Sequence, residues 1–415
     1  MIPFLLALYV TAFVDRINIG FAALTMNKEL VISSQQFGFA AGVFFFGYVL
    51  FEVPSNLLLH RIGARIWIAR ILISWGIIAV LTAFVSTAPQ LYTVRFLLGI
   101  AEAGYFPGIV LYLTYWFPQR EQAHSIALFM TGIPIASILG SPISGFILDQ
   151  IHWLHLSSWR WLLILEGTPA IAGAFLCYFL LPNHPMDAKF LTDNEKKSIE
   201  NELERDSTKV SELSAVEALR NGRVWYLAII GVTHAVATYS ISFWLPQLIK
   251  SIVSDSSNLI VGFLLIIPYL VALIGMVLVS RHSDRTLERR HHVAVCAVVA
   301  AIALVSLNAS HSTFLSIALL SVAVLGTFSL LPLFFALPGE FLSGFSAASG
   351  IALITSVANL GGFAGPYAVG FIHTQTGSLY AGMTLVGISL FVCAALVFFL
   401  PKTEHLVTNR RLNIS

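Results

Sequence analysis

The stretch LYTVRFLLGIAEAGYFPGIVLYL, residues 91–113, decides the fold of this chain. It has the length and apolar character of a membrane-spanning helix, yet it carries one cation, Arg95, and one carboxyl, Glu102. Seven residues make almost two helical turns, so we expect both groups on one face, about 10 Å apart along the axis. Ionisable groups at mid-membrane cost about 2.5–3.5 kcal/mol each on insertion scales and persist where they line a watery or partnered cavity. The stretch therefore predicts a helical bundle built around a buried polar site.

The composition of the whole chain agrees with this interpretation. Of 415 residues, 57% are hydrophobic and 11% charged, and the mean hydropathy is +0.83, whereas soluble domains are about 25% charged. We therefore expect an all-α integral membrane protein in contact with the lipid bilayer. The net charge of +2 comes without a basic patch outside loops, which argues against a nucleic-acid partner. The three cysteines lie far apart inside apolar runs and favour no metal or redox site.

Apolar stretches of about 20 residues divide the chain into two halves. We predict an N-terminal six-helix bundle over residues 1–181, a cytoplasmic linker over 182–222, a C-terminal six-helix bundle over 223–402 and a cytoplasmic tail over 403–415. Within the linker, Thr192 and Glu195 form a capping-box pattern, which predicts a surface helix from Asp193 to Asp206. The first apolar run is too long for a cleavable signal peptide. The twelve predicted spans are 2–24, 36–58, 66–86, 91–115, 123–147, 159–181, 223–248, 258–280, 292–309, 313–335, 346–372 and 379–400.

The distribution of Lys and Arg predicts the orientation in the membrane. Of the 23 basic residues, 18 fall in alternate loops, the linker and the tail, and three fall in the opposite loops. Arg16 and Arg95 lie inside spans. Because cytoplasmic loops carry the excess of positive charge, we expect both termini and the linker in the cytoplasm. The expected location is the inner (plasma) membrane, and we expect a monomer.

Two motifs repeat at one fixed distance along the chain. Arg61 in the loop after the second span is matched by Arg285, 224 residues later, and Pro142 in the fifth span is matched by Pro366 at the same distance. Parallel six-span repeats joined by a linker are typical of alternating-access transporters whose site lies between the halves. We expect a gating or structural role for the residues of these motifs, which are Arg61, Asp284, Arg285, Gly140, Pro142, Gly365 and Pro366.

The repeat also reveals an asymmetry of charge. The position 224 residues after Asp15 is Tyr239, and the position after Arg95 by the same distance is Leu319. The first half holds the buried charges, so we expect the coupling chemistry there.

Five segments together resemble the anion:cation symporter family of the major facilitator superfamily. The likeness spans nearly the whole chain and is greatest to the bacterial branch that carries tartrate, sugar acids and aromatic acids. His60 stands where the loop motif of the superfamily has an acid, which puts a gate contact there in doubt. The matching segments are DRINIGFA (15–22), PSNLLLHRIGAR (54–65), RFLLGIAEAGYFPG (95–108), WRWLLILEG (159–167) and NLGGFAGPY (359–367).

The resemblance and the physics of the side chains imply a set of roles. Arg95 is expected to hold the substrate carboxylate, because a guanidinium pairs with a carboxylate through two hydrogen bonds and Lys cannot; a structural ion pair with an acid is the alternative. Asp15 and Glu102 are expected to carry protons, and Arg16 to partner one of these acids. The remaining candidates for contacts with substrate are Tyr48, Asn359, Tyr239 and His234, each of which could equally serve helix packing.

Two departures from the family pattern bear on the substrate. Phe13 stands where relatives have Tyr, and the tenth span reads PLFFALP (332–338) where many relatives have Phe-Trp and a small polar residue. A site with fewer hydrogen-bond donors suits an aromatic or partly apolar acid better than a fully hydroxylated sugar acid.

The sequence thus predicts a secondary active transporter that takes up a small organic carboxylate with protons by alternating access, without a cofactor or metal. A passive facilitator or exchanger for organic anions is the alternative, although buried acids beside Arg95 count against it. An intramembrane enzyme is disfavoured, because no metal-spaced His/Glu cluster or nucleophile–base constellation stands out.

Overall fold

The computed structural model describes residues 2–207, 220–286, 288–337 and 345–400, and every regular element within them is helical. The predicted tail and its basic residues lie outside this range. The first half contains α1 (Ile2–Glu29), α2 (Ser34–Ile62), α3 (Ala64–Thr82), α4 (Ala88–Glu102), α5 (Tyr105–Thr114), α6 (Gln119–Met130), α7 (Gly132–Gln150) and α8 (Ser158–Leu180). The second contains α11 (Gly222–Ile252), α12 (Asn258–Thr286), α13 (Arg290–Ser306), α14 (Thr313–Ala336), α16 (Phe345–Ala358), α17 (Leu360–Thr376) and α18 (Leu379–Phe398).

Local sequence sets several helix starts. Ser33 caps α2, accepting from the backbone N–H of Gln36, whose own side chain accepts from the Ser33 N–H. Thr87 caps α4 in the same manner. In the linker, Thr192 and Glu195 form the predicted capping box, and the surface helix is α9 (Asp193–Ser207). Three short 3₁₀ turns complete the described elements: η1 (Trp153–His155), η2 (Pro185–Asp187) and η3 (Leu307–Ala309).

The helix predicted over 91–115 is not continuous. It is broken between α4 and α5, where Gly104 has a φ of 83°. A side chain there would be strained by that backbone conformation and would also collide with the Ser55 side chain of α2. The expectation of a single straight helix was wrong, because the requirement for close packing against α2 outweighs helix continuity. Glu102 therefore ends α4 at the break.

Two more predicted spans are broken in their middle. The fifth span is divided into α6 and α7 at Thr131, three residues before Pro134, whose missing N–H cannot support a continuous helix. The eleventh is divided into α16 and α17 at Asn359. Within the described residues, eleven stretches are long and apolar enough to cross a membrane, and the broken eleventh span completes the twelve.

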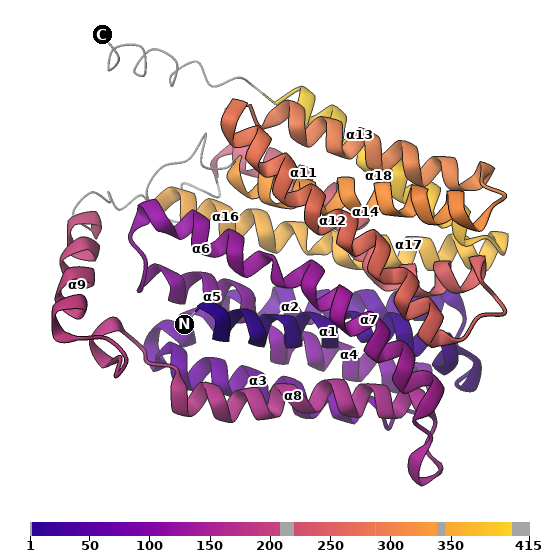
Figure 1. Ribbon diagram of the computed structural model, residues 1–415, viewed down its shortest axis with the longest axis horizontal. Helices are drawn as coiled ribbons and strands as arrows, with labels where there is room; N and C mark the ends of the chain where they lie inside the picture. The colour runs from indigo at the N-terminus through magenta and orange to yellow at the C-terminus, as the bar shows by residue number, and fades with distance from the viewer. Residues whose placement is uncertain (1, 208–219, 287, 338–344, 401–415) are drawn as a thin grey trace.

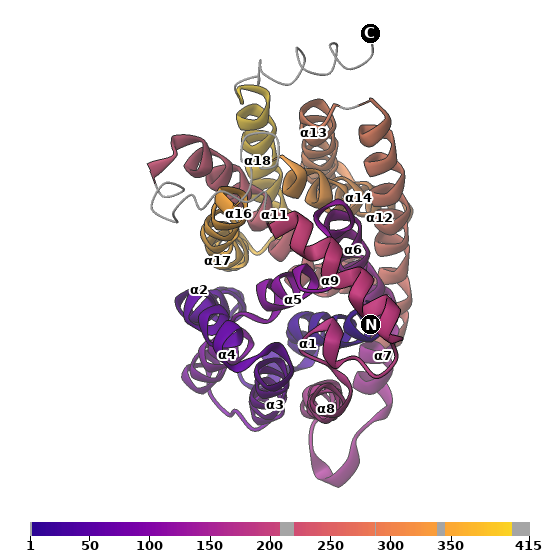
Figure 2. The same ribbon diagram turned by 90° about the vertical axis from the view of Figure 1, so that its left-hand side faces the viewer.

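The helices form two bundles that lie side by side. In Figure 2, α1–α5, α7 and α8 occupy the lower part of the molecule and α11–α18 the upper part. Helix α9 stands across one end of the bundle in Figure 1, near the start of α1. We call this the linker end, because α8 ends there and α11 begins there. The other end is called the opposite end.

Toward the opposite end the two bundles touch along two equivalent seams. At one seam Gly38 of α2 packs against Pro366 of α17, and at the other Gly262 of α12 packs against Pro142 of α7. At each glycine an added Cβ would collide with backbone, so the helices approach as closely as backbones can. Gly38 and Gly262 are 224 residues apart, which is also the distance between Pro142 and Pro366. The repeat in the sequence is therefore also a repeat in the contacts between the halves.

Polar groups reinforce this end of the interface. Asp149, at the end of α7, accepts hydrogen bonds at the start of α12 from Asn258 Nδ2 at 2.8 Å, the Asn258 N–H at 3.2 Å and the Leu259 N–H at 2.7 Å. Gln35 of α2 donates to the Tyr367 hydroxyl and, through its backbone N–H, to the Thr374 hydroxyl of α17, both at 3.0 Å. The opposite end is thus held closed by tight packing and by a charged helix cap.

Candidate functional site

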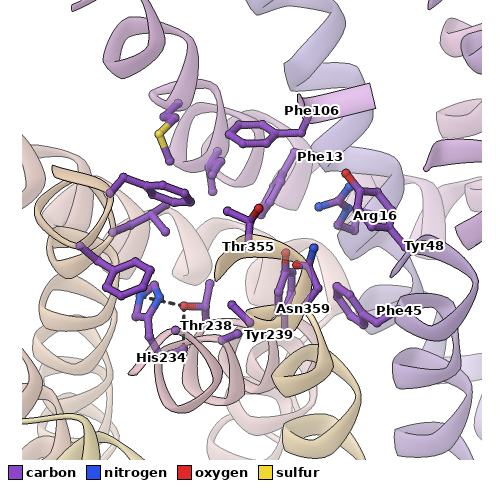
Figure 3. A pocket seen from close by; sticks show the side chains of 18 of the residues that line it. Phe13, Arg16, Phe45, Tyr48, Phe106, His234, Thr238, Tyr239, Thr355 and Asn359 are labelled. Carbon is purple, nitrogen blue, oxygen red and sulfur yellow. Dashed lines mark hydrogen bonds between the residues drawn. The ribbon is translucent and has the colours of Figure 1, made fainter. Parts of the chain in front are cut away.

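A cavity of about 880 Å³, including the space at its mouth, lies between the bundles. This is within the range of about 300–1,000 Å³ that is usual for small-molecule sites. Its walls come from the first half of α1, the middle of α2, α5, the α6–α7 break, α11, the end of α14 and the α16–α17 break (Figure 3). The lining residues are Tyr9, Phe13, Arg16, Phe45, Tyr48, Glu52, Phe106, Met130, Ile133, Gly231, His234, Ala235, Thr238, Tyr239, Leu331, Phe334, Phe335, Thr355, Ala358 and Asn359.

Arg16 is the cation of this cavity. Its guanidinium pairs with Glu102, whose side chain is 1% exposed, while the Arg16 side chain is 10% exposed. Arg16 also lies 5.6 Å from the centre of the Tyr48 ring, and Figure 3 shows the two side chains together at one side of the cavity. A guanidinium with one carboxylate partner keeps further N–H donors, so it can also contact a ligand in the cavity.

Arg95 occupies a different environment from the one that the sequence analysis expected. It does not line the cavity, and its residue is 1% exposed. Its Nε donates to the Ala40 carbonyl at 3.4 Å, and its guanidinium lies 5.2 Å from the centre of the Phe44 ring. Arg95 Nη2 is buried without a hydrogen-bond partner among the described residues. The sequence identified the depth of this cation correctly but not the direction in which it points, and Arg16 takes the place at the cavity.

Asp15 is buried behind the cavity wall, between α1 and α3. It accepts hydrogen bonds from Trp75 Nε1 and, at 3.1 Å, from Asn18 Nδ2. Adjacent residues on a helix point about 100° apart, which is why Asp15 faces α3 while Arg16 faces the cavity. The two predicted proton carriers, Asp15 and Glu102, both lie outside the lining, and of these Glu102 is joined to the cavity through Arg16.

The four remaining candidates for substrate contacts all line the cavity. Tyr48 faces it from α2, and Asn359 from the α16–α17 break. Tyr239 of α11 packs against Phe45, with ring centres 4.3 Å apart across the two halves. His234, one turn before Thr238 on α11, contacts both that residue and α14.

The cavity also contains groups that the sequence analysis did not assign to it. Glu52, expected to satisfy backbone groups near Pro54, lines the cavity and accepts from the Ser356 hydroxyl of α16 at 2.8 Å. Thr238 follows His234 by four residues, the spacing at which side chains on a helix meet, so that spacing was an available signal. The pairing of Glu52 with Ser356 joins the two halves and has no signal in a single sequence.

The residues of the repeated motifs have separate structural roles. Gly140 packs against Val14 of α1, and Gly365 against α11, each within its own half. Pro142 and Pro366 lie at the seams between the halves. Arg61 and Arg285 are exposed near the ends of α2 and α12. Asp284 lies 3.9 Å from Arg289.

In the loop after the second span, His60 Nδ1 lies 3.1 Å from the Tyr115 hydroxyl, a contact within the first half. The conformation described thus leaves a gate contact at this motif untested.

Comparison with known proteins agrees with the fold and the site. The Major Facilitator Superfamily profile matches residues 5–366 and 256–412. A "Putative tartrate transporter" of Agrobacterium vitis is 42% identical over 97% of this chain and 90% of its own length. The "Putative metabolite transport protein NicT" of Pseudomonas putida is 41% identical over 97% and 92%.

Solved structures of low sequence identity share the fold. A bacterial homologue of the human lysosomal transporter Spinster has a TM-score of 0.75 at 17% identity, covering 96% of each chain. The xylose transporter XylE of E. coli also has a TM-score of 0.75, at 16% identity, covering 97% of this chain and 98% of its own. The chain therefore belongs to the major facilitator superfamily and is a multi-pass membrane transporter rather than an enzyme.

Proposed function

We propose that this transporter takes up a small organic monocarboxylate together with protons, and that Arg16 holds the carboxylate. The observation that carries the proposal is the position of Arg16: it is a guanidinium that lines a largely apolar cavity and is paired with an acid outside the lining. In such an environment a carboxylate ligand gains a charge-assisted, two-point contact that water does not reproduce.

Competition for this guanidinium would couple substrate to protons. When the substrate carboxylate approaches Arg16, Glu102 loses part of its counter-charge while remaining buried. An unpaired buried carboxylate is costly, and binding a proton removes that cost. Substrate and proton would therefore bind together and leave together. Asp15, held by Trp75 and Asn18, is a second proton carrier in this proposal.

The walls of the cavity favour a flat or partly apolar substrate over a fully hydroxylated sugar acid. Phe45 and Tyr239 form one aromatic pair, and Tyr9 and Phe106, with ring centres 5.9 Å apart, form another. Aromatic rings supply area for stacking and few donors for hydroxyl groups. The relatives named as tartrate and metabolite transporters support an organic anion as the substrate class.

The transport cycle follows from the seams at the opposite end. With the linker and both termini in the cytoplasm of a bacterial inner membrane, the conformation described is closed toward the outside. Breaking the seams would open the cavity outward. Movement of one monoanion with one proton is electroneutral, and a second proton would add about 2.3 kcal/mol of driving force per 100 mV.

The test is counterflow of labelled carboxylates into proteoliposomes, with and without a pH gradient. We expect organic monocarboxylates to compete, their neutral amides to compete poorly, and an inward proton gradient to drive accumulation. If amides compete as well as the acids, the carboxylate is not recognised and the proposal is wrong.

A passive exchanger for organic anions is the competing possibility, and the same experiment separates it. It predicts full exchange in the absence of a gradient and no accumulation when a proton gradient is imposed. The buried Glu102 on Arg16 favours coupling, because a passive carrier has no use for an acid that competes with its substrate.

A further inference from the structure

The imidazole of His234 is held in one orientation on the side of the cavity away from Arg16. His234 is 4% exposed and lines the cavity. Its Nε2 lies 3.0 Å from the Thr327 carbonyl oxygen of α14 and 3.1 Å from Thr238 Oγ1. Figure 3 places His234 and Thr238 at one side, Arg16 and Tyr48 at the other, and Thr355 and Asn359 between them.

These contacts decide which ring nitrogen carries the hydrogen. A carbonyl oxygen can only accept, so His234 Nε2 must donate to Thr327. The Thr238 hydroxyl hydrogen is already directed to the backbone carbonyl of His234, at 3.1 Å, so that oxygen is also an acceptor toward Nε2. In the neutral ring, Nδ1 is then a bare acceptor.

Nδ1 has no hydrogen-bond partner within the part of the chain that the structure describes. An unpaired acceptor in a mostly apolar cavity is costly to leave unsatisfied, and a ligand that supplies a donor removes the cost. The cavity therefore has two distinct poles: a guanidinium at Arg16 that requires an anion, and an imidazole acceptor at His234 that requires a donor.

We propose that His234 determines specificity by accepting a hydrogen bond from a hydroxyl or N–H group at the end of the substrate away from its carboxylate. The inference rests on the proposed transport of a carboxylate through Arg16 and deepens it. The substrate class is a monocarboxylate with a hydrogen-bond donor at its far end and an apolar, preferably aromatic, body that lies between Phe45, Tyr239 and Phe106.

The test is competition in counterflow by a matched series of acids. The series is benzoate, its 3- and 4-hydroxy derivatives, the corresponding methoxy derivatives and the 4-carboxy derivative. A methoxy group accepts but cannot donate, so only the hydroxy acids satisfy Nδ1. We expect one of the hydroxy acids to compete about five- to tenfold better than its methoxy counterpart and than benzoate, the ratio of one ordinary hydrogen bond.

A variant pair assigns this preference to the residue. His234→Phe should bind benzoate as well as the wild type does and should lose the preference for the hydroxy acid. Thr233→Val is the matched control, because the Thr233 hydroxyl donates to the Ile230 carbonyl of its own helix and Thr233 is not among the lining residues. The control should keep the preference.

The outcomes are distinct. Equal competition by hydroxy and methoxy acids in the wild-type protein overturns the inference about His234 and leaves the transport of carboxylates intact. Strongest competition by the 4-carboxy acid also overturns it, since the ring would then act as a charged donor. Failure of every acid to compete overturns the proposed function itself. The wild-type ranking decides the matter even if His234→Phe does not fold.

Discussion

Arg16 and Arg95 lie 5.5 and 5.2 Å from the centre of the same Phe44 ring, yet they have different surroundings. Arg16 has a carboxylate partner and a face on the cavity, whereas Arg95 is enclosed by protein and bonded to a backbone carbonyl. A sequence shows that a charge is at mid-membrane, but the direction of its side chain depends on helix rotation within the bundle. That rotation is set by packing between segments far apart in the chain, so Arg95 was the natural but incorrect choice for the cavity.

The first prediction compares the two arginines by the same substitution. Arg16→Lys should weaken competition by carboxylates about tenfold or more, because an ammonium cannot make the planar two-point contact. Arg95→Lys should change it by less than about threefold, since that side chain is remote from the cavity. Counterflow competition curves measure both. A loss of binding in Arg95→Lys alone would return the anchor to that residue.

The second prediction concerns the acid on Arg16. Glu102→Gln imitates the protonated acid, so Arg16 should stay available and carboxylate binding should be kept or strengthened at all pH values. Proton-driven accumulation should be lost while exchange continues. The measurement is uptake with and without a pH gradient, together with binding across pH.

Glu166→Gln is the matched control for this experiment. Glu166 is also a buried acid, but its partner is the Ser144 hydroxyl at 2.6 Å, and it is not among the residues that line the cavity. Accumulation should survive in this variant. If both variants lose accumulation equally, coupling is spread over the buried acids and does not reside on Glu102.

At the scale of helices, the breaks are the informative feature. The α6–α7 and α16–α17 breaks both reach the cavity, through Met130 and Ile133 on one side and Ala358 and Asn359 on the other. The positions of the twelve spans followed from hydropathy, because burial in lipid requires long apolar runs. The breaks did not, because they depend on local close contacts such as Gly104 against Ser55.

The third prediction addresses the seams between helices. Gly38→Ala and Gly262→Ala each add a methyl group where backbone from the other half leaves no room. Both variants should fold, since each half keeps its own core, but the closed opposite end should be disfavoured and transport should fall about tenfold or more. Gly222→Ala is the control, because nothing lies within 4 Å of its Cβ position. Uptake rates and thermal stability, measured together, separate the two effects.

If either seam variant transports at the wild-type rate, the close approach at that glycine is not required for closure. If instead the thermal stability falls as much as the rate, the substitution has damaged the fold rather than the conformational equilibrium.

For the whole molecule, most of the architecture was predictable. The two halves and the surface helix at 193 followed from composition and a capping pattern, and the superfamily is confirmed by comparison. The arrangement of the halves around the site was not predictable in detail. Contacts such as Glu52 with Ser356 join residues about 300 positions apart, and no local pattern records them.

The fourth prediction tests the charged cap across the interface. Asp149 accepts three hydrogen bonds at the start of α12. Asp149→Asn removes the charge that favours the helix N-terminus, worth about 0.3–2 kcal/mol, and so should shift the conformational equilibrium up to about 30-fold toward an open opposite end. Spin labels at Val31 and Phe314, both well exposed near that end, should report a larger population at long distance. An unchanged distance distribution would contradict a role for this cap.

The two glycine–proline seams carry a lesson about ancestry. Since Gly38 faces Pro366 while Gly262 faces Pro142, each copy of the duplicated gene supplies the glycine of one seam and the proline of the other. A bulkier side chain on one seam would tilt the bundles unless its twin changed in step. Selection must therefore act on these four positions as a single inherited unit, and natural variants are expected to alter them jointly.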